Sequence, residues 1–550
     1  MTETKRAPVL LNDEQVRQYI ANGYIKIDYD VPGEVHATIA RKLDEMVTSG
    51  PNLGNNVLPQ VPEFRHVLNS PEVQGALISL LGDDYLEHPH RYCHDSKPKE
   101  EKPDDIAAAV AKQCHQDSYT PMSRPRQHYP RYARIIYYPQ DTPIELGPTH
   151  VTPGTSCHKL ISDEDRNNAM PMKGPAGSLW ITHFDVAHAA GVNLTEQVRH
   201  MIKFIYIRRT EPKAPAWNCQ SDRWENPQVL ESPWDLELMW SHFWDWMCGK
   251  QNRYDSFFAT AASSSATGSA NGNIGQLVEG LGGDEIDDVL AAVKQLAAHG
   301  ADAAEAVPTL VEMLNKDHQA ARAAATYALG AIGEPAVAAL VECLEEAGRV
   351  GWVEGAQTAW TEGTVLMMDE AHALGAIGAP AVSSLISLLE SAGEWGRINA
   401  AFALGEMDSQ AVGAVPALTR CLDDDSHRVV RTAIDALGTI GGDASGYVTR
   451  MGRFLVESKP EWEETLTGKR AWNARDQVRV NTATAMARLG AQAGAAEDAL
   501  VSALDDPCGY VSLYATSALS HLGSATAGRA VMDLVMAQRW DSSLSAVRPW

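Results

Sequence analysis

Four residues in the first 200 positions have the types and spacing to hold a metal ion and an organic acid. His115 and Asp117 form a His-x-Asp pair, His188 follows much later, and Arg199 comes shortly after it. Two histidines and one carboxylate make the facial triad of non-haem Fe(II) sites, which leaves coordination positions open for a cosubstrate and O₂. Arg199 offers a rigid fork of donors for a carboxylate. The residues therefore predict an Fe(II) site with a dicarboxylate cosubstrate anchored at its far end.

The elements that position these residues are expected to be strands of one barrel. Asp117 lies two positions after His115, so on a strand both side chains face the same way. His188 is far enough along the chain to lie on a later strand, and Arg199 is expected across a hairpin turn from it.

Three stretches resemble the phytanoyl-CoA dioxygenase family. The stretch His188-Ala-Ala-Gly-Val-Asn-Leu-Thr-Glu-Gln-Val-Arg199 resembles the family's distal motif, residues 135–155 its central strand, turn and strand, and residues 11–24 its opening helix. The resemblance implies an Fe(II)/2-oxoglutarate oxygenase on a double-stranded β-helix (a jelly-roll, cupin-like fold). It also implies that His115, Asp117 and His188 bind iron and that Arg199 binds the distal carboxylate of 2-oxoglutarate. Ala190 departs from relatives that often carry a serine there, which removes one secondary cosubstrate contact.

A second His-x-Asp pair, His183 and Asp185, competes for the role of His115 and Asp117. Its third ligand would have to be His200 or His242, and too few strand-forming residues follow it to close a barrel around a metal. His183 is also an odd number of positions from His188, so on a regular strand it faces away from the site. We therefore assign the site to the first pair.

Further residues are candidates for the cosubstrate site and the substrate pocket. Thr149 and Thr152 lie in a family-like stretch and either could bond a carboxylate, and Lys203 should share a strand face with Arg199. At most one of Tyr137 and Tyr138 faces the site, because they alternate. The alternative is that the pocket candidates are ordinary satisfied residues of the barrel. We predict the substrate pocket at Leu86, His88, His90, Tyr92 and Tyr137.

Composition limits the class of partner and the compartment. The 550 residues carry a formal charge of −25, which argues against nucleic acid or an anionic membrane as a general partner. The eight cysteines are scattered, as expected for reduced thiols in a cytoplasmic protein. No segment approaches the ~20 apolar residues of a membrane span.

The chain changes character near residue 256, which predicts an α+β multidomain protein. We expect an oxygenase domain at 1–255, a flexible linker at 256–275 and an all-α solenoid at 276–550. The motif Ala328-Leu-Gly-Ala-Ile-Gly333 recurs at 373–378 and, in altered form, at 403–408 and 436–441. Spacings of about 30 to 50 residues are typical of stacked helix pairs. This half resembles a HEAT-repeat solenoid.

Tryptophans cluster outside the repeat pattern. Trp240 and Trp244 share one helix face, which either packs on the barrel, walls a pocket or forms an interface. Two insertions, 348–363 and 459–475, each carry two tryptophans. They either pack on their own helices or contact the oxygenase or a partner.

These observations predict an Fe(II)- and 2-oxoglutarate-dependent oxygenase of a small organic substrate, with decarboxylation of 2-oxoglutarate to succinate. Related halogenases replace the carboxylate with a small residue, so Asp117 favours hydroxylation or desaturation. Two alternatives remain: a protein hydroxylase whose solenoid captures its substrate, and a non-enzymatic scaffold with a relic barrel. The solenoid could also serve a protein partner or self-association.

Overall fold

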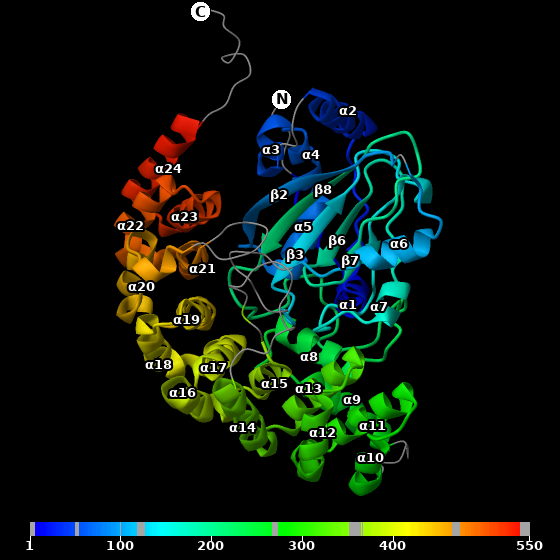
Figure 1. The fold of residues 1–550 in the computed structure, drawn as a ribbon, viewed down its shortest axis with the longest axis vertical. Coiled ribbons are helices and arrows are strands. Elements are labelled where there is room, and N and C mark those ends of the chain that lie inside the picture. The colour runs from blue at the N-terminus through cyan, green and yellow to red at the C-terminus, as the bar shows by residue number, and fades with distance from the viewer. Residues whose placement is uncertain are drawn as a thin grey trace, which may run out of the picture.

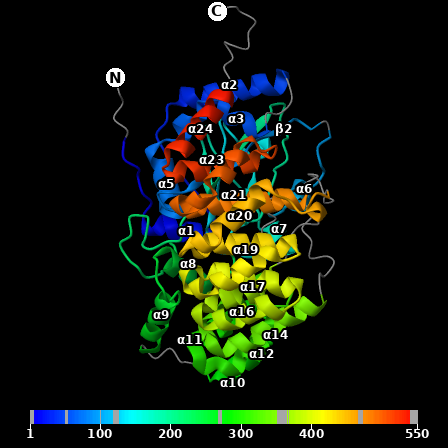
Figure 2. The same cartoon turned by 90° about the vertical axis from the view of Figure 1, so that its left-hand side faces the viewer.

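Two antiparallel β-sheets form the first half of the chain, and a curved stack of helices forms the second half (Figure 1). The computed structural model describes residues 6–49, 54–99, 101–117, 127–266, 273–350, 365, 367–464 and 473–538. The helical stack runs along one side of the sheets, so the two halves share a long boundary (Figure 2).

The larger sheet has five strands in the order β1-β6-β3-β8-β2, and the smaller has three in the order β5-β4-β7. All pairs are antiparallel, as expected for a jelly roll that closes by hairpins and crossovers. The strands are β1 (Tyr24–Lys26), β2 (Leu86–Ser96), β3 (Tyr132–Tyr137), β4 (His150–Val151), β5 (Met170–Pro171), β6 (Leu179–His183), β7 (His188–Ala189) and β8 (Arg199–Ile207).

The two faces of the larger sheet have different surroundings. Ile136, Trp180 and Met201 form a small core with Val151 of the smaller sheet, so their face lies between the two sheets and is the inner face. Cross-strand partners point the same way, and Lys203 pairs with Ile136. Lys203 and its neighbours at alternate positions therefore line the inside of the barrel.

The N-terminal helices cover the outer face. Tyr137 and Phe204 on that face contact the ring of Phe64 in α4. The first helix begins with a capping box, in which Asn12 and Gln15 satisfy each other's backbone N–H groups. The helices of this half are α1 (Asp13–Asn22), α2 (Gly33–Ser49), α3 (Val57–Gln60), α4 (Phe64–Leu68), α5 (Pro71–Leu81), α6 (Ile106–Gln113), α7 (Asp163–Asn167), α8 (Glu237–Met247) and α9 (Asp255–Ala266).

The helical half is a two-layer stack. Its inner helices, from α11 through every second helix to α23, contact one another in succession, and the helices between them form the outer layer. The helices are α10 (Ile274–Gly280), α11 (Ile286–Ala298), α12 (Val307–Met313), α13 (Gln319–Ile332), α14 (Glu334–Val350), α15 (Asp369–Ile377), α16 (Val382–Ser391), α17 (Glu394–Glu406), α18 (Val415–Arg420), α19 (His427–Ile440), α20 (Val448–Val456), α21 (Ala474–Leu489), α22 (Glu497–Ser502), α23 (Gly509–Leu522) and α24 (Ala525–Gln538).

The repeated Ala-Leu-Gly motif has a packing reason. A Cβ on Gly405 would lie 3.1 Å from the Cα of Ala436, and one on Gly438 would lie 2.8 Å from the Cβ of Ala485. Glycine in these inner helices therefore allows each repeat to approach the next closely. The motif recurs because each inner helix meets the same kind of neighbour.

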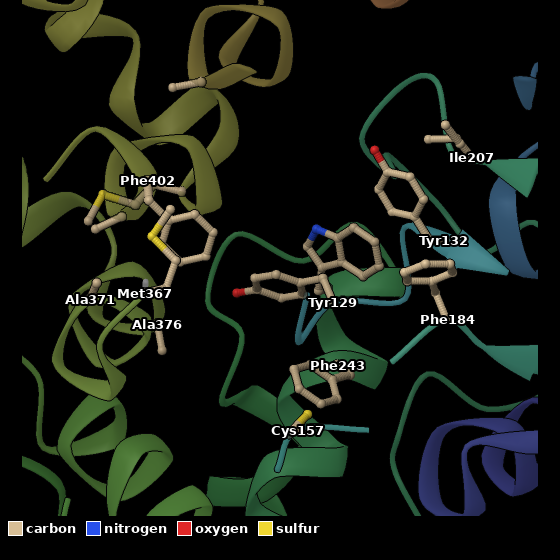
Figure 3. Close-up of a cluster of buried hydrophobic side chains, with 14 of the residues drawn as sticks. Tyr129, Tyr132, Cys157, Phe184, Ile207, Phe243, Met367, Ala371, Ala376 and Phe402 are labelled. Carbon is tan, nitrogen blue, oxygen red and sulfur yellow. The ribbon is translucent and has the colours of Figure 1, made fainter. Parts of the chain in front are cut away.

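The tryptophan helix α8 lies between the barrel and the stack. It contacts α1 on one side and α13 on the other, and Trp240 and Trp244 are fully buried. Helix α8 is therefore part of the core and forms the interface between the barrel and the helical stack. Figure 3 shows the two sides of this region, with Tyr129 and Phe243 facing Met367 and Phe402 of the stack.

The prediction of a flexible linker at 256–275 is wrong for its first part, which is helical. Helix α9 occupies Asp255–Ala266 and buries Phe257 at 3% exposure. The alanines and serines that follow Phe257 continue the helix, because the apolar first turn of α9 is packed against the rest of the protein. Residues 267–272 lie outside the described residues, as does most of the first predicted insertion. In the second insertion, Trp462 packs on Phe454 of α20, so this tryptophan packs on its own helices.

No single helix in the described ranges is long and apolar enough to cross a membrane, and α15 passes that test only together with Ala379–Ser391, across a bend of 113°. The eight cysteines are all free thiols. The cytoplasmic location stays a prediction.

Candidate functional site

His115 and His188 lie side by side because their backbones pair. Each residue donates its N–H to the carbonyl of the other at 2.9 Å, which forms an antiparallel bridge between the end of α6 and β7. Their ring centroids lie 4.4 Å apart. The expected strand at His115 is thus a single bridge after a helix. The proximity of the two rings does not depend on a long strand.

Each ring is oriented by the same kind of contact, with the backbone carbonyl two residues earlier in the chain. The Nδ1 of His115 lies 2.8 Å from the carbonyl of Gln113, and the Nδ1 of His188 lies 3.1 Å from the carbonyl of Val186. Because a carbonyl only accepts, each Nδ1 carries the proton and each Nε2 keeps its lone pair. Metal-binding histidines are commonly fixed in this way, by donating the other N–H to a backbone carbonyl.

Both Nε2 atoms point toward Asp117. They lie 3.9 Å (His115) and 3.6 Å (His188) from the carboxylate oxygens. The three residues form one of two groups of metal-ligating side chains found in the described parts of the chain, with ligand atoms within 4.8 Å of one another. One ion could contact all three ligand atoms without a change of backbone.

The ionisation states also suit a metal. Burial raises the pKa of the Asp117 carboxyl, but Lys203, His188 and Arg134 together hold it well below its ordinary value. Burial and the Arg134 guanidinium hold the pKa of His188 well below its ordinary range. The site therefore has an ionised carboxylate and a neutral imidazole, the forms that bind a divalent cation.

Arg199 lies on the same inner face and is almost completely buried, at 3% exposure. Its Nε and Nη1 atoms have no hydrogen-bond partner in the described ranges. Buried charged donors without partners are costly, and a planar guanidinium matches a carboxylate in two hydrogen bonds. The donor set fits Fe(II) at the triad and an organic carboxylate at Arg199.

The family comparison agrees with this geometry. The model of the phytanoyl-CoA dioxygenase family matches residues 19–201. Residues 19–201 form a phytanoyl-CoA dioxygenase domain. The HEAT-repeat model matches residues 275–352 and 382–448, so this domain is followed by HEAT repeats. The predicted family and fold class are confirmed, and the cofactors of this oxygenase class are Fe(II), 2-oxoglutarate and O₂.

Solved structures similar to the dioxygenase domain share little sequence with it. The non-heme alpha ketoglutarate dependent carbocyclase SnoK from nogalamycin biosynthesis is 16% identical, with 37% of this chain and 88% of that chain covered and a TM-score of 0.29. The non-heme monooxygenase ThoJ, in its Ni complex, is 17% identical, with 40% and 90% covered and a TM-score of 0.28. No curated protein matches the chain.

The competing pair in the dioxygenase domain, His183 and Asp185, forms no ligand cluster in the described residues. Instead, His183 Nδ1 accepts the backbone N–H of Asp185 at 3.2 Å, and burial lowers the pKa of His183 to about 4. The second ligand group consists of Cys93, Asp95 and His200, paired on the outer face of the sheet. There the two nitrogens of His200 contact Asp95 and Asp44 at 2.9 and 2.7 Å.

The two predicted threonines have different surroundings. Thr152 donates its hydroxyl to the backbone carbonyl of Asp165 at 3.1 Å, so the hydroxyl proton is already used within the protein. Thr149 is buried, and its backbone N–H donates at 2.7 Å to the hydroxyl of Tyr138, a residue of the inner core. Arg199 lies over the same tyrosine ring, at 6.0 Å. Thr149 therefore remains a candidate cosubstrate contact.

The prediction of the substrate pocket is wrong for Leu86, His88 and His90, because the pairing of β2 is interrupted near these residues. The pairing of β2 with β8 shifts between Glu87 and Arg91, so three residues bulge out there. Pro89 has no N–H to donate, which is why such residues occur at bulges. Leu86 packs in the main core, and the rings of His88 and His90 are directed to the solenoid, where they contact Tyr510 of α23.

Beyond the bulge, Tyr92 pairs with Lys203 and faces inward, as predicted. The prediction that Tyr137 lines the pocket is wrong. Tyr137 faces outward, and its hydroxyl lies 2.8 Å from Nδ1 of His36 in α2. Of the two adjacent tyrosines, Tyr138 is the one that faces the inner core.

Three residues near the site were not predicted. Gln116 lies between two ligands, points the opposite way, and donates its amide to the carbonyls of Thr155, His158 and Asp185. His94 lies two positions after Tyr92, and its buried Nε2 has no partner in the described ranges. Arg134 contacts Asp117 directly, at 2.5 Å. The sequence does mark Arg134, because it is the one charged residue in the apolar and aromatic run 132–138.

Proposed function

We propose that this protein is an Fe(II)- and 2-oxoglutarate-dependent hydroxylase of a small organic molecule. The observation that carries the proposal is the arrangement of two histidine Nε2 atoms around an ionised carboxylate. On the inner face of the larger sheet, the Nε and Nη1 donors of Arg199 have no hydrogen-bond partner among the described residues. The carboxylate of Asp117 occupies the position that halogenases leave open, which supports hydroxylation or desaturation.

In this proposal His115, Asp117 and His188 hold Fe(II), and Arg199 binds the distal carboxylate of 2-oxoglutarate. The bound metal and cosubstrate supply the oxidising power, with O₂ reduced and 2-oxoglutarate converted to succinate and CO₂. The protein supplies orientation, because Gln113 and Val186 fix the two rings and Gln116 ties the segment between the ligands to its surroundings. The apolar inner core at Ile136, Trp180 and Met201 excludes water from the cosubstrate side.

The alternative of a protein hydroxylase is less well supported. A solenoid that captures a macromolecule normally offers its concave side. Here inner helices contact the barrel instead, through Tyr327 on α13, Glu406 on α17 and Tyr510 on α23. A partner or a second copy would therefore have to bind elsewhere on the HEAT repeats, and the small-molecule substrate remains our proposal.

An anaerobic titration tests the function. The full-length protein is titrated with Fe(II) and then with 2-oxoglutarate while the visible charge-transfer band of the chelate is followed. A saturable band, followed by succinate formation on admission of O₂, is the expected result. A protein that binds Fe(II) but forms no band with 2-oxoglutarate would contradict the proposal, as would one that binds no Fe(II).

Arg199→Ala is expected to weaken 2-oxoglutarate binding by a factor on the order of 100, because a buried bidentate charge pair is worth about 2–5 kcal/mol. The dissociation constant from the same band gives the measurement. Arg199→Lys keeps the charge but not the fork, so it should lie between the wild type and Arg199→Ala. An unchanged constant in Arg199→Ala would assign the role to another cation, with Lys203 the first candidate.

A further inference from the structure

A second cluster of metal-ligating side chains lies on the outer face of the larger sheet. Cys93 and Asp95 occupy alternate positions of β2, and His200 is the cross-strand partner of Asp95 on β8. Alternate residues of one strand and paired residues of two strands share a face, so the three side chains converge. Cys93 and His200 are buried, whereas the side chain of Asp95 is 11% exposed. The solvent side therefore offers an entry path for an ion.

The ligand atoms of this cluster have nearly the spacing that a tetrahedral zinc ion requires. Sγ of Cys93 lies 3.1 Å from Oδ1 of Asp95 and 4.0 Å from Nδ1 of His200, and that nitrogen lies 2.9 Å from the same oxygen. Zinc bonds of about 2.0–2.3 Å in a tetrahedron place the ligand atoms about 3.3–3.6 Å apart. Each observed separation lies within about half an ångström of that range. Small side-chain rotations would complete the geometry.

Asp44 of α2 supplies the outer contact that metal-bound histidines commonly have. Its Oδ1 lies 2.7 Å from Nε2 of His200, while Nδ1 of the same ring faces Asp95 and Cys93. A histidine that binds a metal through one nitrogen usually donates the N–H of the other to a carboxylate, which fixes the ring and its tautomer. The side chain of Asp44 is 63% exposed, so it can be changed with little cost to the fold.

We propose that Cys93, Asp95 and His200 bind a zinc ion. Zinc accepts sulfur, nitrogen and oxygen ligands together, and the three protein ligands leave its fourth position to a water molecule. Asp44 is a positioning residue in this proposal. The ion joins the edge strand β2 to β8 near Arg199, where β8 begins, and through Asp44 it ties α2 to the sheet. This site goes beyond the proposed oxygenase function and does not depend on it.

Zinc would replace two protons in this cluster and leave its charge unchanged. Burial and Asp95 raise the pKa of the Cys93 thiol well above its ordinary value. Burial lowers the pKa of His200, but hydrogen bonds with Asp95 and Asp44 raise it by more. Without zinc, one thiol, one imidazolium and two carboxylates sum to −1. Zinc binding releases the thiol proton and the Nδ1 proton to solvent, and Zn²⁺ with one thiolate, two carboxylates and a neutral ring again sums to −1. The affinity for zinc should therefore rise with pH.

Cobalt(II) tests the site in the full-length protein, because it replaces zinc and reports a thiolate ligand by a charge-transfer band in the near ultraviolet. The triad of His115, Asp117 and His188 contains no sulfur ligand, so cobalt bound there gives no such band. The metal-free protein is titrated with cobalt(II) under nitrogen. We expect a saturable thiolate band that zinc abolishes and that persists in His188→Ala.

Variants then locate the band. Cys93→Ser should abolish it, and Asp44→Asn should weaken cobalt binding about 10–100-fold, as loss of an outer partner usually does. Cys114→Ser is the control for the first variant, because it also removes a buried thiol, and one that lies beside the triad. Glu45→Gln is the control for the second, because it removes a charge at the next position of α2, where the carboxylate contacts Arg41. Both controls should bind cobalt as the wild type does.

Three results would overturn the proposal: no thiolate band in the wild type, a band that Cys93→Ser retains, or a band that Cys114→Ser loses. The first would mean that His200 bridges Asp44 and Asp95 as an imidazolium without a metal. The other two would place the thiolate ligand elsewhere in the chain. Should Cys93→Ser fold poorly by circular dichroism, Asp44→Asn decides, and an affinity equal to that of Glu45→Gln would reject the site. The visible band with Fe(II) and 2-oxoglutarate tests the oxygenase separately, so either proposal can fail without the other.

Discussion

His188→Ala is expected to abolish Fe(II) binding and the visible band with 2-oxoglutarate, while the far-ultraviolet circular dichroism stays that of the wild type. The variant removes one of three protein ligands. Loss of even an outer hydrogen bond to a ligand typically costs 10–100-fold in metal affinity, so removal of the ligand itself should cost at least about 100-fold. The fold should persist, because the bridge to His115 uses backbone atoms.

His183→Ala is the matched control for this variant. It also removes a buried imidazole from the same domain, but His183 belongs to no ligand group in the described residues. The control should retain the band. A His188→Ala protein that binds Fe(II) like the wild type, or a His183→Ala protein that alone loses it, would refute the assignment of the triad.

Arg131→Ala is expected to lower the free energy of unfolding by about 3–5 kcal/mol, because it leaves buried carboxylates without their partner. Arg131 precedes β3 and lies 2.8 Å from Glu211 of the barrel side and 2.5 Å from Glu406 at the end of α17. Arg253 strengthens the same contact through the backbone carbonyl of Glu406, at 2.9 Å. This cluster joins the two halves in a buried position.

Urea unfolding of the full-length chain measures the effect. Arg420→Ala is the control, because Arg420 pairs with Glu390 on the outer layer with both side chains more than half exposed. Exposed pairs contribute about 0–1 kcal/mol, so the control should change stability little. If Arg131→Ala and Arg420→Ala lowered the free energy of unfolding equally, the buried cluster around Arg131 would not hold the two halves together. Deletion of the solenoid near Asn273 is a poorer test, since it would also uncover α8.

Residue types, their spacing and the family resemblance could predict the main parts of this site, although the expected strand at His115 is only an isolated bridge. The His-x-Asp pair and the distal histidine come together, and Arg199 lies on the same strand face as Lys203, which contacts Asp117. Strand alternation also placed Tyr92 and Lys203 correctly. The roles of these residues stay predictions until metal and cosubstrate binding are measured.

The errors arose where tertiary contacts override a simple period. Alternation from Leu86 assigned His88 and His90 to the barrel, but the bulge at Pro89 interrupts it and the solenoid binds both rings. Alternation cannot say which of Tyr137 and Tyr138 faces inward, because both faces of this sheet are buried. The small polar composition of 256–275 predicts a linker, whereas the buried ring of Phe257 packs within helix α9.

The contacts between barrel and solenoid also limit how this gene can change its length. Solenoid proteins commonly gain and lose whole repeats by duplication, since each repeat meets only its neighbours. Here α13, α15, α17 and α23 each present a particular residue to the barrel: Tyr327 and His372 to His128, Glu406 to Arg131, and Tyr510 to His90. An added repeat between α13 and α23 would displace every later contact at once. We therefore expect homologues with this interface to keep the same number of repeats between those helices, and to vary in length beyond α24 or in the outer layer.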